Sequence, residues 1–423
     1  MPSTASVSGS GLLPGLREIE DVGRGGSRTG GGARGGSLGG SRAGYHRHLF
    51  DDAELDLRAW FIERATAAGL AVETDRNANI WAWWGVPGPD AVVTGSHLDS
   101  VPGGGAYDGP LGVVSALDAV AALRAAGFAP SRPFAVVVFA EEEGSRFGVA
   151  CLGSRLMTGQ LNPERARALL DPDGVSLAEA GSRAGFDVAN LGHDPEALAR
   201  IGLFIELHVE QGRGLIDLGA PVAVASSILA HGRWRLTFTG QANHAGATLM
   251  HGRRDPVVAA SRAIVGLRDI AASHAAQDAR TTVGRSNWAP GGTNVIAAEA
   301  SVWLDARAAT DADTRALVAE IVEASRASAA LEGCELDVAE ESWSGAVRFD
   351  VGLRERFAAA LGDVPRLSTG AGHDAGVLAG VVPTAMLFVR NPTGISHAPE
   401  EFAEHADTLA GVEALTSILR SLL

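Results

Sequence analysis

Three side chains that can bind a metal ion lie close together in the segment 92–109. His97 and Asp99 follow a short apolar run, and Asp108 follows a glycine-rich loop in which the backbone can fold back toward the same point. Imidazole and carboxylate groups are ligands of zinc-like ions, and charged groups just beyond a buried strand are costly unless something satisfies them. Residues i and i+2 of an extended segment face the same way, so we expect Asp99 to orient the His97 ring. A hydrogen-bonded histidine with two solvated aspartates is the alternative interpretation of this segment alone.

Three consecutive glutamates, Glu141 to Glu143, follow the apolar run 133–140, which has the character of a central strand covered on both faces. Adjacent carboxylates at the end of a buried strand repel one another strongly unless a cation compensates. One of them could bind a metal ion while its neighbour serves as a general base. The residues alone do not decide which glutamate takes which role, and a solvated acidic loop is the ordinary alternative.

Two more histidines lie near strand ends. His208 alternates with apolar residues in the run 203–212 and so shares one strand face with Glu206 and Glu210, an expensive arrangement without a ligand. His397 comes just after the apolar run 383–389. Sites in open α/β sheets form at the carboxyl ends of strands, so we expect His397 to complete the coordination sphere that begins at His97.

The order of the expected elements predicts an α/β chain with a small inserted domain. A strand, the helix 111–126 and a second strand predict a βαβ unit with a parallel sheet. From about residue 221 the pattern changes to β-α-β-β-α-β over roughly 120 residues. This stretch contains further polar residues, namely Asn243 and His244 in a loop, and Asn294 and Arg307 at either side of a strand. Arg307 could grip a carboxylate with two hydrogen bonds, although a structural salt bridge is equally ordinary.

Composition limits the classes of protein. A length of 423 residues exceeds the usual domain size and indicates two or three domains. Acidic minus basic residues give 50 − 35, a net charge of −15, which argues against nucleic acid or an anionic membrane as a partner. Two cysteines, with neither a signal-peptide pattern nor a membrane-length apolar run, predict a soluble cytoplasmic protein. The glycine- and serine-rich stretch 22–44 is predicted to be a flexible insertion.

Several of these motifs occur together in one order between Tyr45 and the C-terminus. They are Gly95-Ser-His-Leu-Asp-Ser, Glu141-Glu-Glu-Gly-Ser-Arg-Phe, Glu206-Leu-His-Val-Glu-Gln-Gly, Asn243-His-Ala-Gly, the stretch from Asn294 to Arg307, Gly370-Ala-Gly-His-Asp and Gly394-Ile-Ser-His. In this set the chain resembles the di-zinc aminoacylase/carboxypeptidase superfamily. Within it, the chain is most similar to the branch of N-carbamoyl-L-amino-acid hydrolases, allantoate amidohydrolases and β-alanine synthases. One departure is Gly246-Ala-Thr-Leu-Met, where the branch usually has Gly-Thr-Thr-Pro-Met.

The resemblance implies an α/β fold in which a metal-dependent exopeptidase-like catalytic domain with a mainly parallel sheet is interrupted by an α+β lid domain. The catalytic domain would comprise residues 45–220 and 341–423, and the lid and dimerisation domain residues 221–340. Residues 1–44 would be a flexible glycine-rich N-terminal segment. The resemblance also implies a homodimer and two divalent metal ions per subunit, zinc or manganese, with cobalt or nickel compatible with the same ligand types.

Site residues can be carried over one by one from the resemblance. His97 and His208 would hold one metal ion, Glu143 and His397 the other, and Asp108 would bridge the two. Glu142 would be the general base. The substrate-binding residues would be Gln211, His244, Asn294, Arg307 and His373, with Arg307 taking the α-carboxylate.

The implied function is that of an amidohydrolase which cleaves the ureido or carbamoyl C–N bond of a small molecule that also carries a carboxylate. The resemblance allows allantoate or an N-carbamoyl-L-amino acid as the substrate, and residues 45–84 slightly favour allantoate. A deacylase or dipeptidase of the same superfamily is one alternative. A non-catalytic binding protein is another; it predicts the loss of Glu142 or of a metal ligand, whereas every such position is filled.

Overall fold

The computed structural model describes residues 12–25, 43–362 and 364–423. The chain forms two compact units, one made of the residues up to Ser226 together with Phe349–Leu423, and the other of Ser227–Arg348. Among the described residues, no helix combines the length and the apolar character needed to cross a membrane. The two units are described in turn below, because each has its own core.

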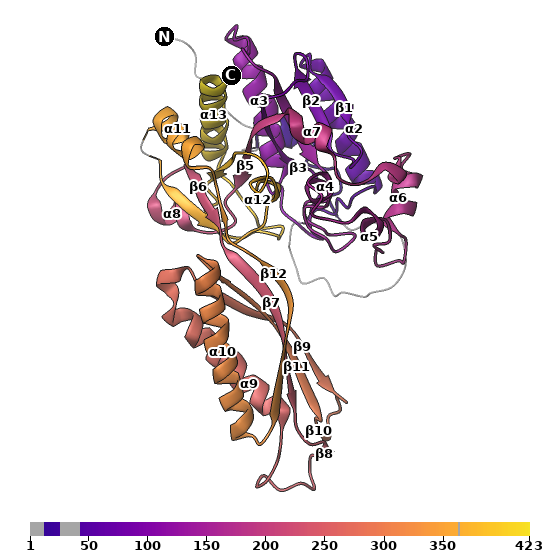
Figure 1. Cartoon of the computed structure of the whole chain (residues 1–423), viewed down its shortest axis with the longest axis vertical. Coiled ribbons are helices and arrows are strands. Elements are labelled where there is room, and N and C mark those ends of the chain that lie inside the picture. Colours follow the sequence, from indigo (N-terminus) through magenta and orange to yellow (C-terminus); the bar gives the residue numbers. More distant parts are fainter. Residues whose placement is uncertain (1–11, 26–42, 363) are drawn as a thin grey trace. The chain divides into compact units, whose positions relative to one another are not determined.

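A mixed sheet forms the centre of the first unit (Figure 1). Its strands follow the order β1-β2-β4-β3-β5-β15-β6-β13, and β14 pairs with β6. The central neighbours β4, β3, β5 and β15 are parallel, so their carboxyl ends meet at one edge of the sheet. The strands are β1 (Ala71–Thr74), β2 (Ile80–Trp84), β3 (Ala91–His97), β4 (Phe134–Phe139), β5 (Ile201–Val209), β6 (Val222–Ile228), β13 (Val347–Arg348), β14 (Arg366–Thr369) and β15 (Thr384–Val389).

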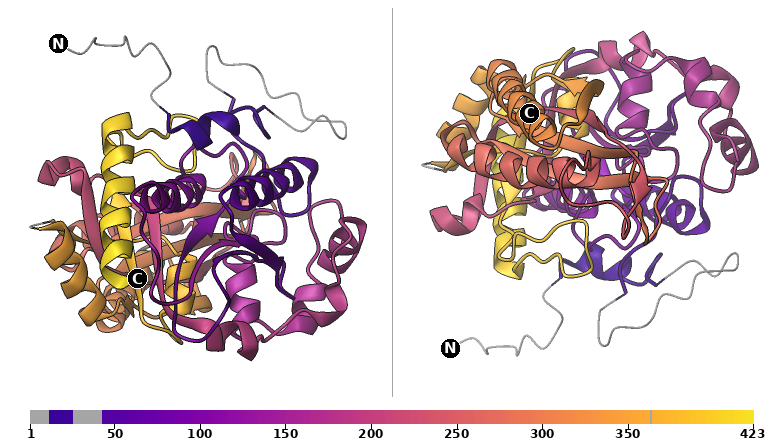
Figure 2. Two further views of the ribbon diagram at one scale, coloured as in Figure 1. Left: turned by 90° about the horizontal axis from the view of Figure 1, so that it is seen from above. Right: turned by 90° about the horizontal axis from the view of Figure 1, so that it is seen from below.

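Four helices cover one face of this sheet: α2 (Asp52–Ala67), α3 (Pro110–Ala125), α11 (Val351–Leu361) and α13 (His405–Leu422). They pack on alternate residues of the central strands, such as Val136 in β4 and Ile205 in β5. The purple α2 and α3 and the yellow α13 lie on the same side of the sheet in the view from above (Figure 2). Helix α3 begins with Pro110, which suits the first helical position because its missing N–H would be unpaired there in any case.

Shorter helices lie in the chain between β4 and β5, between β5 and β6, and before β15. They are α4 (Leu152–Met157), α5 (Pro163–Arg167), α6 (Leu177–Arg183), η1 (Val188–Asn190), α7 (Pro195–Arg200), α8 (Gly214–Leu218) and α12 (Asp374–Leu378). The tryptophans of β2 that alternate with its core residues, Trp81 and Trp83, stack on each other with ring centroids 5.8 Å apart. Both rings are buried and serve the packing of the sheet.

The N-terminal segment 1–44 is predicted to be flexible, but this prediction is wrong for residues 12–25. Helix α1 (Pro14–Glu18) packs into the main core through Leu13, Leu16 and Ile19. The buried Arg47 guanidinium donates hydrogen bonds to the backbone carbonyls of Ile19 and Val22 in the same segment. Burial of these apolar side chains stabilises the segment. The glycine-rich stretch that follows it hides this short apolar pattern in the sequence. Residues 1–11 and 26–42, where most of the predicted insertion falls, lie outside the described residues.

The second unit is a four-stranded antiparallel sheet in the order β12-β7-β11-β9, with two helices packed on one face (Figure 1). Its elements are β7 (Ala230–Thr239), α9 (Pro256–Ser273), η2 (Ala275–Gln277), β9 (Arg280–Ala289), β11 (Glu299–Ala308), α10 (Asp311–Leu331) and β12 (Glu335–Ser344). The predicted order β-α-β-β-α-β is therefore confirmed. Strand β7 alternates between buried and more exposed residues, and its buried face, with Leu236 and Phe238, meets the helices. A separate two-stranded ribbon joins β8 (Asn243–His244) to β10 (Val295–Ile296).

Candidate metal centre

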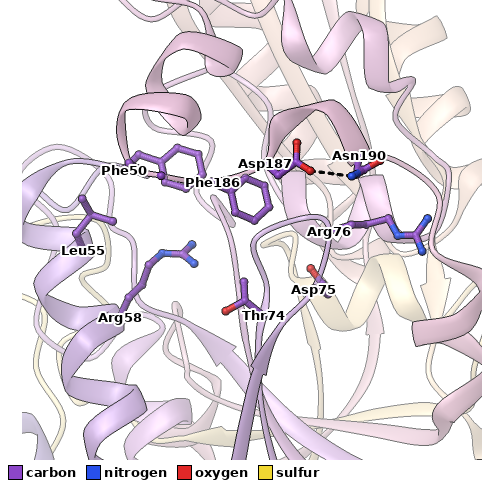
Figure 3. A pocket seen from close by; sticks show the side chains of 11 residues that line it. Phe50, Leu55, Arg58, Thr74, Asp75, Arg76, Phe186, Asp187 and Asn190 are labelled. Carbon is purple, nitrogen blue, oxygen red and sulfur yellow. Dashed lines mark hydrogen bonds between the residues drawn. The ribbon is translucent and has the colours of Figure 1, made fainter.

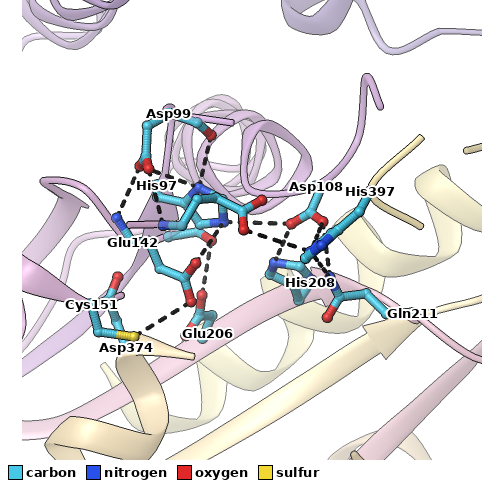
Figure 4. A network of polar contacts seen from close by, with 12 residues as sticks. His97, Asp99, Asp108, Glu142, Cys151, Glu206, His208, Gln211, Asp374 and His397 are labelled. Atoms are coloured by element: carbon cyan, nitrogen blue, oxygen red, sulfur yellow. Dashed lines mark hydrogen bonds and ion pairs between the residues drawn. The ribbon is translucent and has the colours of Figure 1, made fainter. Parts of the chain in front are cut away.

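The histidines and carboxylates predicted from the motifs come together at the carboxyl edge of the central sheet (Figure 4). His97 is the last residue of β3, His208 is the last but one of β5, and Glu143 lies in the loop after β4. His397 lies in the loop after β15. These strands are adjacent and parallel, so residues separated by 300 positions of sequence, 397 − 97, share one site.

Asp108 stands at the centre of this site. Its Oδ1 atom lies 3.6 Å from Nε2 of His97 and 3.2 Å from Nε2 of His208. Its Oδ2 atom lies 3.4 Å from Nε2 of His397, which is itself 3.6 Å from Oε2 of Glu143. Among the groups of described residues that could each hold an ion, two are joined through this one carboxylate, His97-Asp108-His208 and Asp108-Glu143-His397.

The ligand atoms of these residues have the properties that a metal site requires. Among the described residues, Nε2 of His97, Nε2 of His208 and Oε1 of Glu143 are buried without a hydrogen-bond partner. Buried polar atoms without partners are rare and costly, and a divalent cation between them would satisfy all three. The mixed imidazole and carboxylate set suits zinc and manganese. The residues present therefore fit a pair of metal ions.

Backbone carbonyls fix the orientation of the two buried histidine rings. Nδ1 of His97 lies 3.0 Å from the carbonyl oxygen of Asp99, and Nδ1 of His208 lies 3.0 Å from that of Val209. Donation from Nδ1–H to these carbonyls leaves the lone pair of Nε2 facing the site. The Asp99 carboxylate, which is predicted to orient His97, lies 3.5 Å from Nδ1, but its hydrogen bonds come from the backbone N–H groups of Glu142 and Glu143.

The three consecutive glutamates take different positions. Glu141 has a φ of +53°, and its carboxylate accepts hydrogen bonds from the backbone N–H groups of Arg146 and Phe147, so it stabilises its own loop. Oε2 of Glu142 lies 3.7 Å from Nε2 of His97, and its Oε1 accepts a weak hydrogen bond from the thiol of Cys151. Glu143 is the one paired with His397. The three glutamates, which look alike in the sequence, therefore have different surroundings.

The acidic side chains of the site are strongly perturbed. Burial raises the pKa of Glu142 well above its ordinary value, although the neighbouring His97 opposes the rise. Burial, with the repulsion of Asp108, raises the pKa of Glu143 to about 8. Burial would raise the pKa of Asp108 as well, but the nearby His208 and His97 rings hold it well below the ordinary value. Such crowding of buried carboxylates is what a cation would relieve.

Two predicted substrate-binding residues border the same cluster. Nε2 of Gln211 donates a hydrogen bond of 2.9 Å to Oδ2 of Asp108, beside His397. His373 is buried, and its ring centroid lies 4.4 Å from that of His208. Burial lowers the pKa of His373 well below its ordinary value, and neither of its nitrogens has a hydrogen-bond partner among the described residues. A neutral imidazole in this position is free to bind a polar group of a ligand.

Comparison with known proteins identifies the family of this chain. Residues 93–421 match the model of peptidase family M20/M25/M40. The chain belongs to this family. It is 37% identical over 360 residues to an N-carbamoyl-L-amino acid amidohydrolase of Geobacillus stearothermophilus, covering 82% of this chain and 86% of that one. It is 32% identical to an allantoate amidohydrolase of Escherichia coli (strain K12), covering 90% and 93%.

A solved structure of a hydantoinase/carbamoylase family amidase from Burkholderia multivorans superimposes with a TM-score of 0.84 at 30% identity and covers 96% of both chains. The predicted branch of M20 hydrolases, the α/β fold class and the class of amidohydrolase are confirmed by these relatives. Metal dependence is a property of the M20 family, and the candidate metal groups of this chain agree with it.

The other predicted site residues of this M20 chain lie in its second unit. His244 in β8 pairs with Val295 in β10. The backbone N–H of Ala245 donates a hydrogen bond to the carbonyl of Asn294, the residue before Val295. His244 and Asn294 are therefore neighbours. Arg307 in β11 forms two hydrogen bonds with Asp305, of 2.8 and 3.1 Å. The salt bridge considered for Arg307 is therefore present, and it shows the guanidinium in a geometry that suits a carboxylate.

Further buried acidic residues lie around the site of this M20 chain, and the sequence patterns do not single out all of them. Glu206 and Glu210 share the buried face of β5 with His208, but their carboxylates accept structural hydrogen bonds, Glu206 from Ser96 and Ala375, and Glu210 from the backbone of α8. The buried Glu401, which accepts hydrogen bonds from the backbone at Tyr107 and Asp108, was not singled out. Its neighbour Glu400 is exposed, so the pair resembles a solvated surface in the sequence.

A separate cavity of about 470 Å³ lies between α2, β1 and the segment after α6 (Figure 3). Phe50 and Phe186 stack over it with ring centroids 5.9 Å apart. Its charged side chains already have partners, because Arg58 is paired with Glu54 and Arg76 with Asp194. The side chains that line the cavity therefore take part in the packing of the first unit.

Proposed function

We propose that the protein is a binuclear metal amidohydrolase which cleaves a carbamoyl or ureido C–N bond in a small molecule that carries a carboxylate. The substrates that fit are allantoate and N-carbamoyl-L-amino acids. The observation that carries the proposal is Asp108, whose two carboxylate oxygens face two separate groups of ligands. The names of the relatives support the type of bond and the two substrate classes.

Two divalent ions, zinc or manganese, with cobalt or nickel also compatible, would polarise the scissile carbonyl and lower the pKa of an attacking water. His97, His208, Asp108, Glu143 and His397 would hold them. Glu142 would accept a proton from the water and return it to the leaving nitrogen. Its buried position raises its pKa, which suits a group that must hold a proton between the two steps.

Hydrolysis would release ammonia and carbon dioxide from either substrate. The remaining product would be ureidoglycine from allantoate and the free amino acid from an N-carbamoyl amino acid. In the first unit, Gln211 and His373 would bind the substrate. In the second unit, His244, Asn294 and Arg307 would do so, with Arg307 exchanging its Asp305 partner for the substrate carboxylate. We propose that this unit serves as the lid and dimerisation domain.

A substrate panel tests the proposal. Protein freed of metal and reloaded with zinc or manganese would be assayed for ammonia release from allantoate and from several N-carbamoyl-L-amino acids. N-acetyl amino acids and dipeptides, assayed for the free amino acid, represent the deacylase and dipeptidase alternatives. Turnover of a carbamoyl or ureido compound at a kcat/KM at least ten-fold above every N-acyl substrate is expected. Preference for an N-acetyl amino acid or a dipeptide would refute the proposed bond specificity.

A further inference from the structure

Two loops that carry proposed metal ligands meet at one buried carboxylate. The first loop ends at Asp108, and the second runs from Gly394 to Glu401 and includes His397. Glu401 is only 5% exposed, and its Oε1 atom accepts hydrogen bonds of 3.0 Å from the backbone N–H groups of both Tyr107 and Asp108. A carboxylate that accepts two backbone N–H groups fixes the course of that backbone.

The second oxygen of Glu401 connects to the other loop. Oε2 accepts a hydrogen bond of 3.0 Å from the hydroxyl of Ser396, the residue before His397. The same hydroxyl lies 3.3 Å from Oδ2 of Asp108, so it is placed between the two acids. His397 has a φ of +56°, a left-handed conformation that is unfavourable for a residue other than glycine. Such a conformation persists only where neighbouring contacts hold it, and the Ser396–Glu401 bond supplies one.

The glycine-rich loop before Asp108 makes room for this carboxylate. A Cβ atom at Gly105 would lie 2.3 Å from Oε1 of Glu401, which is closer than real Cβ contacts allow. Any side chain at position 105 would therefore displace Glu401 or the loop. Gly105 is required because the backbone comes close to the buried Glu401 carboxylate, in addition to any need for a flexible turn.

We infer that Glu401 is a positioning residue that ties the Asp108 loop to the His397 loop and thereby sets the affinity for both metal ions. The inference rests on the proposed function, since it concerns the same metal pair. Asp108 must present one oxygen to each group of ligands, so a shift of its backbone would loosen both sites at once. Ser396 contacts the His397 side, so its loss would chiefly loosen the site formed with Glu143.

Four variants test this role through metal affinity, measured by competition with a chelator on apo-protein titrated with zinc or manganese. Glu401→Ala should weaken binding roughly 10- to 100-fold, the usual effect of removing a partner that orients metal ligands. Glu401→Gln should stay within a few-fold of wild type, because the amide oxygen can still accept both backbone N–H groups. Ser396→Ala should weaken one of the two ions more than the other. The exposed neighbour provides a matched control, and Glu400→Ala should bind both ions as wild type does.

The outcomes separate this inference from the proposed function. A wild-type protein that binds no metal would refute the function and the inference together. If wild type binds two ions and a folded Glu401→Ala binds them equally well, only the inference is refuted. If Glu401→Gln loses as much affinity as Glu401→Ala, the charge matters and the positioning role is refuted. Should Glu401→Ala fail to fold by circular dichroism, Ser396→Ala decides, and unchanged affinity for both ions would overturn the inference.

Discussion

The Asp99 carboxylate accepts a hydrogen bond of 3.1 Å from the backbone N–H of Glu142. A residue that follows β3 thus holds the proposed general base that follows β4, and it holds the next residue, Glu143, in the same way. The two strands are parallel neighbours, which brings their following loops together. Asp99 therefore connects the loop of one proposed metal ligand with the loop of another.

Replacing Asp99 by alanine should impair both metal binding and turnover. The loss leaves two backbone N–H groups without their acceptor, so the Glu142–Glu143 loop would lose its fixed course. We expect metal affinity to fall by about 10- to 100-fold, as for other partners that orient metal ligands, and kcat/KM to fall with it. Metal analysis after dialysis and steady-state kinetics would show both effects. Wild-type metal affinity in a folded Asp99→Ala protein would contradict this role.

Glu142→Gln should abolish turnover while leaving both metal ions bound. Removal of a general base typically costs a factor of about 10² to 10⁴ in rate, and Glu142 is not in either of the two groups joined by Asp108. Glu141→Gln is the matched control. Its amide oxygen can still accept the backbone N–H groups of Arg146 and Phe147, so near wild-type kcat is expected. Single-turnover kinetics and metal analysis on both variants would test the assignment, and substantial activity in Glu142→Gln would refute it.

Much of this site can be predicted from the sequence, because ligands at the ends of neighbouring parallel strands leave a local pattern. His97, His208 and His397 each stand at or just beyond an apolar run, and the rule of strand carboxyl ends then brings them together. Glu401 leaves no such pattern, since its burial depends on a backbone segment almost three hundred residues earlier. Helix α1 was missed for a related reason, because its few apolar residues gain stability only from a distant core.

Leu16→Ala should destabilise the protein although it lies in a segment predicted to be flexible. The side chain is 2% exposed in the main core, and truncation of a buried leucine to alanine costs about 2–5 kcal/mol. Leu170→Ala is the matched control, since Leu170 is 61% exposed and surface changes of this kind usually stay within about 0.5 kcal/mol. Urea unfolding of both variants would measure the difference. Equal stabilities would show that α1 contributes little to the folded state.

Arg307→Ala should raise KM far more than it lowers kcat. A guanidinium that binds the substrate carboxylate equally in the ground state and the transition state contributes to KM alone, and loss of a charge-assisted pair of about 1.5–3 kcal/mol corresponds to roughly a 10- to 100-fold change. Arg307→Lys should recover only part of the affinity, because an ammonium keeps the charge without the planar pair of donors. Arg285, which stacks on Trp303 in the same sheet, provides a control for loss of positive charge, and Arg285→Ala should keep the wild-type KM. Steady-state kinetics on the preferred substrate would decide, and an unchanged KM in Arg307→Ala would exclude a carboxylate contact by this residue.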